Sequence, residues 1–298
     1  MRTDNDTWDI TTSVGATALF VAAARALEAR RDHPLAVDPY AELFCRAAGG
    51  QWSAMLEGTG ADDRLHSEFG DMFQRYQGAR TRFFDDFFCA AVADGVRQVV
   101  IVAAGLDSRA YRLEWPQDAV VFELDQPKVL EFKREVLAEH GHAPAVERRE
   151  VAADLRGDWQ KALRDKGFYP DKPSTWLAEG LLMYLPATAR DQLCTGIDTM
   201  SAENSRVALE DMQTLDIQAV EAKRAEEQAS PHHASQFFSL IYNDEYPGAA
   251  RWFAEKGWDV QGVSVVDYFG ELGQPIPPPD TDGGQMLRSG RLVTAAKR

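Results

Sequence analysis

The sequence predicts an α/β fold of the Rossmann-like type, in which a mostly parallel sheet forms the centre of a single domain over residues 1–298. Residues 99–102 are Val-Val-Ile-Val, a short β-branched run that is typical of a strand buried on both faces. A second apolar run ends at Asp125, which follows Gly105 by 20 residues. A carboxylate at the end of the next strand, about 20 residues past a small-residue turn, is typical of sheets that bind a ribose.

The turn after the first strand favours one cofactor over another. Turns that bind a dinucleotide usually carry G-x-G-x-x-G, whereas residues 103–108 read Ala-Ala-Gly-Leu-Asp-Ser, with one glycine and an added carboxylate. A carboxylate directed at a pyrophosphate would repel it, but it is compatible with a ribose or a cationic sulfonium. The turn therefore favours S-adenosylmethionine over NAD. An ordinary turn in which Asp107 or Ser108 caps a helix remains an alternative.

The rest of the chain supplies the other strands of a seven-stranded sheet. Residues 150–155 form an expected third strand that ends in a carboxylate and a leucine. Further strands are expected over residues 174–180 and 205–210. The last two, near residues 258–260 and 292–295, are expected to lie antiparallel at the edge of an otherwise parallel sheet.

The segments around the sheet divide the expected domain into four parts. Apolar residues at helical spacing predict a helix over residues 13–31, and Asp38-Pro39 starts a second helix that ends before Gly49-Gly50. Residues 51–70 show no clear period and predict a connection or lid, and the helix leading into the first strand is expected to begin near residue 80. We therefore expect an N-terminal helical cover over the cofactor cleft (1–78), a cofactor-binding core (79–210), a lid insertion (211–250) and C-terminal strands (251–298).

Composition excludes several classes of partner. The net charge of −15 argues against nucleic acid and anionic membranes as binding partners. The start of the sequence lacks the apolar region of a signal peptide and no apolar run reaches 18 residues, so a cytoplasmic protein is expected. Cys45, Cys89 and Cys194 are widely spaced, which predicts reduced core thiols and neither a disulfide nor a metal site.

Four motifs together resemble a known family. They read AAGLDSRAYRL, FELDQPKVLEFK, VAADLRGDW and WLAEGLLMYLP, in this order, from residue 103 to residue 186. Their order and spacing resemble those of S-adenosylmethionine-dependent methyltransferases related to leucine carboxyl methyltransferase. More narrowly, they are similar to O-methyltransferases of actinobacteria, especially mycobacteria. The resemblance extends from about Thr12 to the C-terminus and implies a class I methyltransferase fold with S-adenosyl-L-methionine as its cofactor.

The resemblance implies roles for residues at the first two strands. Arg80 would pair with the carboxylate of S-adenosylmethionine, a task suited to the two-pronged guanidinium. The alternative is a surface pairing of Arg80 or Arg82 with Asp85 or Asp86. Ala103 and Gly105 would form the small-residue turn beside the cofactor, and Asp125 would hold the ribose, as its spacing also indicates.

The later motifs supply the remaining candidates. Asp154 and Leu155 would recognise the adenine, through the carboxylate, a backbone N–H and an apolar wall. The alternative is that Asp154 caps the helix containing Trp159. Glu179, with Gly180 after it, lies at the strand end where such folds present the methyl group.

These observations predict an S-adenosylmethionine-dependent methyltransferase acting on a carboxylate or hydroxyl of a small molecule. A carboxylate is already ionised at neutral pH and needs no catalytic base, which fits a sequence in which no catalytic residue is identified. Two alternatives remain: a non-catalytic protein that binds S-adenosylmethionine, and an NAD-dependent oxidoreductase suggested by the spacing of Gly105 and Asp125.

Overall fold

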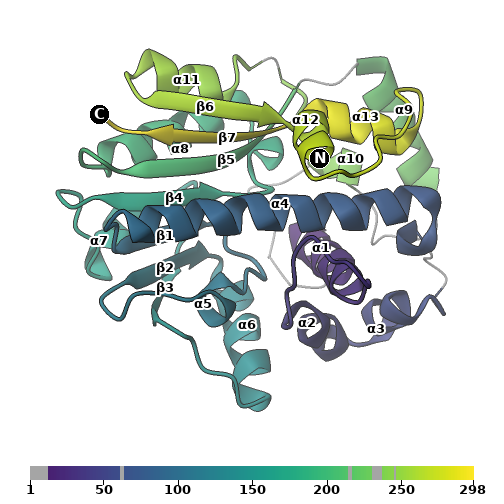
Figure 1. The fold of residues 1–298 in the computed structure, drawn as a ribbon, viewed down its shortest axis with the longest axis horizontal. Coiled ribbons are helices and arrows are strands. Elements are labelled where there is room, and N and C mark those ends of the chain that lie inside the picture. The colour runs from purple at the N-terminus through teal and green to yellow at the C-terminus, as the bar shows by residue number, and fades with distance from the viewer. Residues whose placement is uncertain (1–12, 61–63, 214–216, 230–236, 245) are drawn as a thin grey trace.

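The computed structural model describes residues 13–60, 64–213, 217–229, 237–244 and 246–298, and within them the chain forms one seven-stranded sheet (Figure 1). The strand order is β3-β2-β1-β4-β5-β7-β6. The strands are β1 (Gln98–Val102), β2 (Val120–Asp125), β3 (Glu147–Ala152), β4 (Ser174–Ala178), β5 (Arg206–Met212), β6 (Asp259–Ser264) and β7 (Gly290–Ala296). The mostly parallel seven-stranded sheet is as expected, and β6 and β7 pair antiparallel at its edge. The strand that runs against the others is β7, which lies between β5 and β6.

The direction of the strand order changes at β1, and this change places the site. The chain moves from β1 outward to β2 and β3, and then returns to the other side of β1 with β4 and β5. Ligands of open parallel sheets bind at such a point, beyond the carboxyl ends of the strands. Val102 pairs with Leu124 and Ile101 with Leu177, so the residues that follow β1, β2 and β4 leave the sheet side by side.

The N-terminal helices cover one face of this sheet. They are α1 (Ser13–Ala29), α2 (Ala41–Ala48), α3 (Gly50–Glu57), η1 (Arg64–His66) and α4 (Glu68–Ala93). The first two confirm the helices predicted there, but residues 51–70 are not an irregular connection. They contain most of α3, η1 and the start of α4, and α3 is too short, at 8 residues, to show a period.

Helix α4 begins earlier than expected. Ser67 caps it by accepting a hydrogen bond from the backbone N–H of Gly70 at 3.1 Å, and the helix then runs for 26 residues. The prediction that Arg80 lies near the start of this helix is therefore wrong, because Arg80 lies in its middle. Figure 1 shows α4 crossing one face of the sheet, so that its middle passes beside the carboxyl ends of the central strands.

The remaining helices lie on both faces and at the carboxyl edge of the sheet. They are α5 (Arg109–Arg112), α6 (Pro127–Glu139), α7 (Trp159–Asp165), η2 (Leu182–Tyr184), α8 (Ala187–Thr199), α9 (Ile217–Ala229), α10 (Phe237–Leu240), α11 (Ala249–Glu255), α12 (Val265–Glu271) and α13 (Asp282–Ser289). Helices α5, α6, α12 and α13 pack on the same face as α4, and α7, α8 and α11 pack on the opposite face. No helix in the described parts of the chain is both long and apolar enough to cross a membrane.

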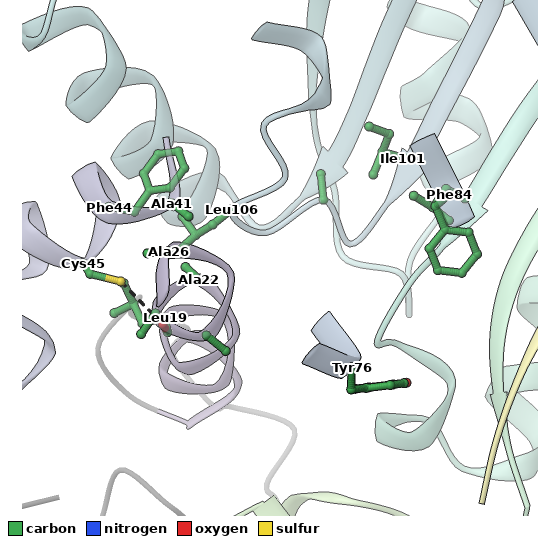
Figure 2. Packing of buried hydrophobic residues seen from close by; sticks show 14 of the residues in the cluster. Leu19, Ala22, Ala26, Ala41, Phe44, Cys45, Tyr76, Phe84, Ile101 and Leu106 are labelled. Atoms are coloured by element: carbon green, nitrogen blue, oxygen red, sulfur yellow. Dashed lines mark hydrogen bonds between the residues drawn. The ribbon is translucent and has the colours of Figure 1, made fainter. Parts of the chain in front are cut away.

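Alternate residues of the strands belong to two hydrophobic clusters, one on each face of the sheet. Val99 and Ile101 pack with α1, α2 and α4, whereas Val100 and Val102 pack on the opposite face, as the two-residue period of a strand requires. Figure 2 shows part of the first cluster, in which Leu19 of α1 lies against α2.

The cysteines only partly follow their prediction as core thiols. Cys45 and Cys194 are buried, and burial raises the pKa of each thiol to about 12. Cys89 is exposed, so the prediction of a core thiol is wrong there. It lies on the outer face of α4, where a small apolar residue can fit the helical pattern without being buried.

Candidate active site

A cavity of about 1140 Å³ lies at the carboxyl edge of the sheet, next to the point where the strand order changes. Its volume exceeds the roughly 300–1,000 Å³ of a typical one-ligand pocket, which gives room for two ligands. The residues predicted from the sequence come from α4 and from the ends of four strands, and all of them line this cavity. They are Arg80, Ala103, Gly105, Asp125, Asp154, Leu155 and Glu179.

The turn after β1 is bonded directly to the end of β2. Asp125 accepts hydrogen bonds from the backbone N–H groups of Gly105 and Gln126, both at 2.6 Å. Burial raises the pKa of Asp125, and these two backbone donors oppose the rise. Each carboxylate oxygen has two lone pairs, so each keeps one that is free for a ligand. The predicted spacing of Gly105 and Asp125 thus corresponds to a direct hydrogen bond, and the Asp125 carboxylate can still accept hydrogen bonds from a ligand.

Ala103 stands at a backbone position that favours glycine. Its φ is +51°, in the left-handed region, and Gly105 has a φ of +47°. A residue with a Cβ adopts this conformation at a cost of about 1–2 kcal/mol. The turn that brings β1 into the cavity is therefore strained at Ala103.

Asp107 does not present a free charge to the cavity. Its carboxylate accepts the backbone N–H of Arg109 at 2.7 Å and forms an ion pair with the same guanidinium, which together lower its pKa against the effect of burial. The argument that Asp107 selects the cofactor by its charge is therefore wrong. The capping alternative holds for Asp107, which accepts the N–H of the first residue of α5, and not for Ser108, which donates its hydroxyl to Asp38 at 2.7 Å.

Arg80 is buried between two carboxylates from neighbouring strand ends. Its Nε lies 2.9 Å from Glu179 and its Nη1 2.6 Å from Glu210. Its Nη2 donates to Gln77 at 2.6 Å. A guanidinium has five N–H donors, so two remain after these three contacts.

The surface alternative for this region applies to Arg82 and not to Arg80. Arg82 is exposed and lies 4.0 Å from Asp86. Asp85 instead binds Arg109 at 2.7 Å and Arg112 at 2.6 Å.

Glu179 connects the two buried arginines of the site. Besides its contact with Arg80, it accepts a hydrogen bond from Arg109 at 2.8 Å. Burial alone would raise the pKa of Glu179, but the positive charges of Arg109 and Arg80 hold it below its usual range. A buried negative charge is therefore kept at the end of β4.

Glu210 is a site residue that the sequence reasoning missed. It accepts hydrogen bonds from the Tyr76 hydroxyl, from Arg80 and, at 2.8 Å, from the backbone N–H of Gly180. Burial raises the pKa of Glu210, whereas the Gly180 N–H and the nearby guanidinium favour its ionised form. The sequence does contain an indication of this role, because Glu210 is a carboxylate near the end of an expected strand, as Asp125 is.

Asp154 lies at the more open side of the cavity. It accepts hydrogen bonds from the Arg156 side chain at 2.6 Å and from its backbone N–H at 2.9 Å, which lower the pKa of Asp154 to about 2. It does not cap the following helix. The N-cap residue of α7 is Asp158, which accepts from the backbone N–H of Lys161 at 2.9 Å. The capping alternative for Asp154 is therefore wrong.

A second set of lining residues is aromatic, and we call it the aromatic half of the cavity. Phe20 of α1 and the α4 residues Phe69, Phe73 and Tyr76 line it. The expected lid contributes Val220, Lys223 and Glu227 from α9, Phe237 and Phe238 from α10, and Tyr242. Residues 230–236 of that lid lie outside the described residues.

Comparisons with known proteins agree with this geometry. Residues 18–198 match the leucine carboxyl methyltransferase family. A protein of Mycobacterium sp. (strain KMS), provisionally named an S-adenosyl-L-methionine-dependent methyltransferase, is 58% identical over 301 residues, with 100% of both chains covered. A protein of Mycobacterium tuberculosis (strain H37Rv) with the same kind of name is 54% identical over 301 residues, again with 100% of both covered.

Solved structures show the same fold at low sequence identity. A DUF574-family protein from Streptomyces avermitilis has a TM-score of 0.53 and 14% identity, with 86% of this chain and 96% of that chain covered. A protein from Thermobifida fusca, provisionally named a methyltransferase, has a TM-score of 0.50 and 16% identity, with 86% and 94% covered.

Proposed function

Because the chain belongs to the leucine carboxyl methyltransferase family and is an S-adenosyl-L-methionine-dependent methyltransferase, we propose that it methylates an oxygen atom, of a carboxylate or a hydroxyl, on a small molecule. The observation that carries the proposal is the cavity itself, whose lining includes both the predicted cofactor residues and an aromatic set, and whose volume gives room for a second ligand. The net charge of −15 supports a small acceptor over a nucleic acid.

The residues present fit the cofactor that the family uses. Asp125 has an unused lone pair on each oxygen, which matches the two hydroxyl donors of a ribose. Arg80 has two unused donors for the carboxylate of the methionine part. At Gly105 even an added Cβ would meet nothing nearer than Ala18 at 3.8 Å, so there is space beside the turn.

We assign the remaining contacts on the same basis. Asp154 and the backbone N–H of Leu155 bind the adenine at the open side, and Ala103 and Gly105 form the floor beside the ribose. Glu179 stabilises the positive sulfonium, because it is a buried carboxylate that its arginine partners keep ionised.

The bound cofactor supplies an electrophilic methyl group, and the protein's task is to align the acceptor and exclude water. Alignment alone accounts for a large part of the acceleration in such displacements. A carboxylate acceptor arrives ionised at neutral pH and needs no base from the protein. We propose that α9 and α10 act as the lid that excludes water, because both contribute side chains to the cavity wall.

Two measurements test the proposal. Isothermal titration calorimetry should show micromolar binding of S-adenosylmethionine and no binding of NAD. Incubation with methyl-tritiated S-adenosylmethionine and a panel of small acids and alcohols should then give labelled esters or ethers. Binding without transfer to any oxygen would contradict O-methylation and favour the non-catalytic alternative, and transfer to nitrogen or carbon acceptors alone would refute the assigned chemistry.

A further inference from the structure

The first half of helix α4 lines the cavity with one stripe of side chains. Arg80 belongs to the cofactor half, and Tyr76, Phe73 and Phe69 follow at helical spacing toward the start of the helix. With a rise of 1.5 Å per residue, Phe69 lies about 10 Å along the helix axis from Tyr76. The stripe therefore changes from charged to aromatic within about one helical turn, between Arg80 and Tyr76, and stays aromatic for about two more turns.

The aromatic end of the stripe is continued by α1. The ring of Phe73 lies 5.2 Å from that of Phe20, 6.0 Å from that of Phe69 and 6.4 Å from that of Tyr76. The three phenylalanines line the cavity and are only half-buried, so part of each ring is available to a ligand. Burial of such apolar surface is favourable, at roughly 25 cal/mol per Å².

Other elements contribute further aromatic surface to the same half. The ring of Phe237 in α10 lies 6.2 Å from that of Tyr184 and 5.2 Å from that of Phe238, and all three line the cavity. Met286 of α13 adds a flexible apolar side chain. Helices α1 and α4 of the N-terminal cover and α10 of the proposed lid thus all supply aromatic surface to the cavity.

Tyr76 stands where the two halves meet. The guanidinium carbon of Arg80 lies 5.5 Å from the centre of the Tyr76 ring, and the ring of Phe73 lies 6.4 Å from the same ring. A ligand that lies along the aromatic half can therefore bring one end toward Arg80 and Glu179, where the cofactor's reactive end is assigned. That end would carry the oxygen that accepts the methyl group.

We propose that the aromatic half of the cavity is the acceptor site, and that the acceptor is a hydrophobic acid or phenol whose apolar body is about 10 Å long. This inference rests on the proposed O-methylation and names its substrate class. A small polar acid would leave the rings uncovered, so it would gain none of the apolar burial that they offer. In the reaction, an oxygen lone pair of the acceptor forms the new O–CH₃ bond. The C–S bond breaks and its electron pair stays on sulfur, so a carboxylate and a sulfonium give an ester and a thioether. A phenol reacts in the same way as its phenolate, once its proton has passed to solvent water.

Binding to the product complex tests this inference directly. The protein is saturated with S-adenosylhomocysteine and titrated in a calorimeter with octanoate, 4-phenylbutanoate and 2-naphthol, and in parallel with succinate and glycolate. We expect the hydrophobic ligands to bind at least tenfold more tightly than the polar ones. In turnover with methyl-tritiated S-adenosylmethionine, the same three should be the better acceptors.

Three variants locate the binding surface. Phe73→Ala and Phe237→Ala should each weaken binding of the hydrophobic ligands about five- to tenfold, the effect expected for one aromatic contact. Their affinity for S-adenosylhomocysteine should change less than twofold. Phe87→Ala is the matched control, because Phe87 is half-buried on α4 but does not line the cavity. Phe237 lies on a separate element, so it keeps the test valid even if Phe73→Ala does not fold.

The outcomes separate this inference from the proposed function. Equal or tighter binding of succinate, or unchanged affinity in both cavity variants, would overturn the hydrophobic acceptor site. Methyl transfer to the polar acids would in that case leave O-methylation intact. Tight binding of octanoate with no transfer to any oxygen would instead remove the proposed O-methylation, and with it the role of this half as an acceptor site.

Discussion

Replacing Asp125 by alanine gives the sharpest test of the cofactor half of the site. Asp125 receives the N–H groups of Gly105 and Gln126, each at 2.6 Å, and keeps one lone pair per oxygen for the ribose. Two hydrogen bonds to the cofactor are therefore lost in the variant. At a net 0.5–1.5 kcal/mol each, they amount to about 1–3 kcal/mol, or roughly a 5- to 150-fold weaker Kd for S-adenosylmethionine.

The same substitution removes the acceptor of two backbone donors, so it also affects folding. We expect the free energy of unfolding to fall by about 1–2 kcal/mol. Asp158→Ala is the matched control, because Asp158 also accepts a backbone N–H, from Lys161, but does not line the cavity. Calorimetry should show weaker cofactor binding only for Asp125→Ala, whereas chemical denaturation should show lower stability for both. An unchanged Kd in a folded Asp125→Ala protein would refute the ribose assignment.

The pH dependence of binding provides a second measurement on the same residue. Burial raises the pKa of Asp125 above its ordinary value of 3.8, and the ribose is best bound by the ionised form. Affinity for S-adenosylmethionine should therefore fall with decreasing pH, beginning above pH 3.8, and the variant should lack this loss. The sign for folding is opposite: a raised pKa favours the protonated folded protein, so this group's contribution to stability decreases as pH rises from 3.8 through its folded pKa. A pH profile of Kd that is the same in both proteins would contradict the assignment.

Three further predictions follow from local geometry. Ala103→Gly removes the strain of a left-handed alanine but also adds conformational entropy to the unfolded state. Thermal unfolding should therefore show a free energy of unfolding that is about 0–1 kcal/mol higher than in the original protein. Ala103→Val should be clearly less stable than the original protein. Arg80→Lys keeps the positive charge but loses the planar guanidinium that contacts two carboxylates and Gln77. The Kd for S-adenosylmethionine should therefore rise about tenfold. An unchanged Kd would exclude Arg80 from the cofactor contacts. At pH 8 a thiol reagent should label only Cys89 in the native protein and all three cysteines in denaturant. The reason is that burial raises the pKa of Cys45 and Cys194 to about 12. Rapid labelling of Cys45 or Cys194 in the native protein would contradict this prediction.

The strands and their ends could be predicted because the signals are local. Short β-branched runs mark β1 and β2, and a parallel sheet brings the ends of its strands to one edge whatever lies between them. Asp125, predicted from its spacing, and Glu179, predicted from the family resemblance, both line the cavity as strand-end residues. The same rule applied to β5 would have identified Glu210.

The start of α4 and the partners of Arg80 could not be predicted in this way. The buried face of α4 carries Gln74, Gln77 and Arg80 as well as apolar residues, so the hydrophobic period is interrupted where the helix passes the cavity. Arg80 has acidic residues close by in sequence, but its carboxylate partners are Glu179 and Glu210, about 100 and 130 residues away. The orientation of α4 decides this pairing, because it buries Arg80 and leaves Arg82 exposed.

The place of β7 inside the sheet has a consequence for synthesis of the chain. Residues 290–296 leave the ribosome after the other six strands of this sheet, yet they pair with β5 on one side and β6 on the other. Until they emerge, β5 has an unsatisfied edge and β6 has no neighbour in the sheet. An open strand edge readily pairs with other chains. The nascent protein therefore carries an aggregation-prone edge until residues 290–296 have emerged, and a chain truncated before Gly290 would carry it permanently.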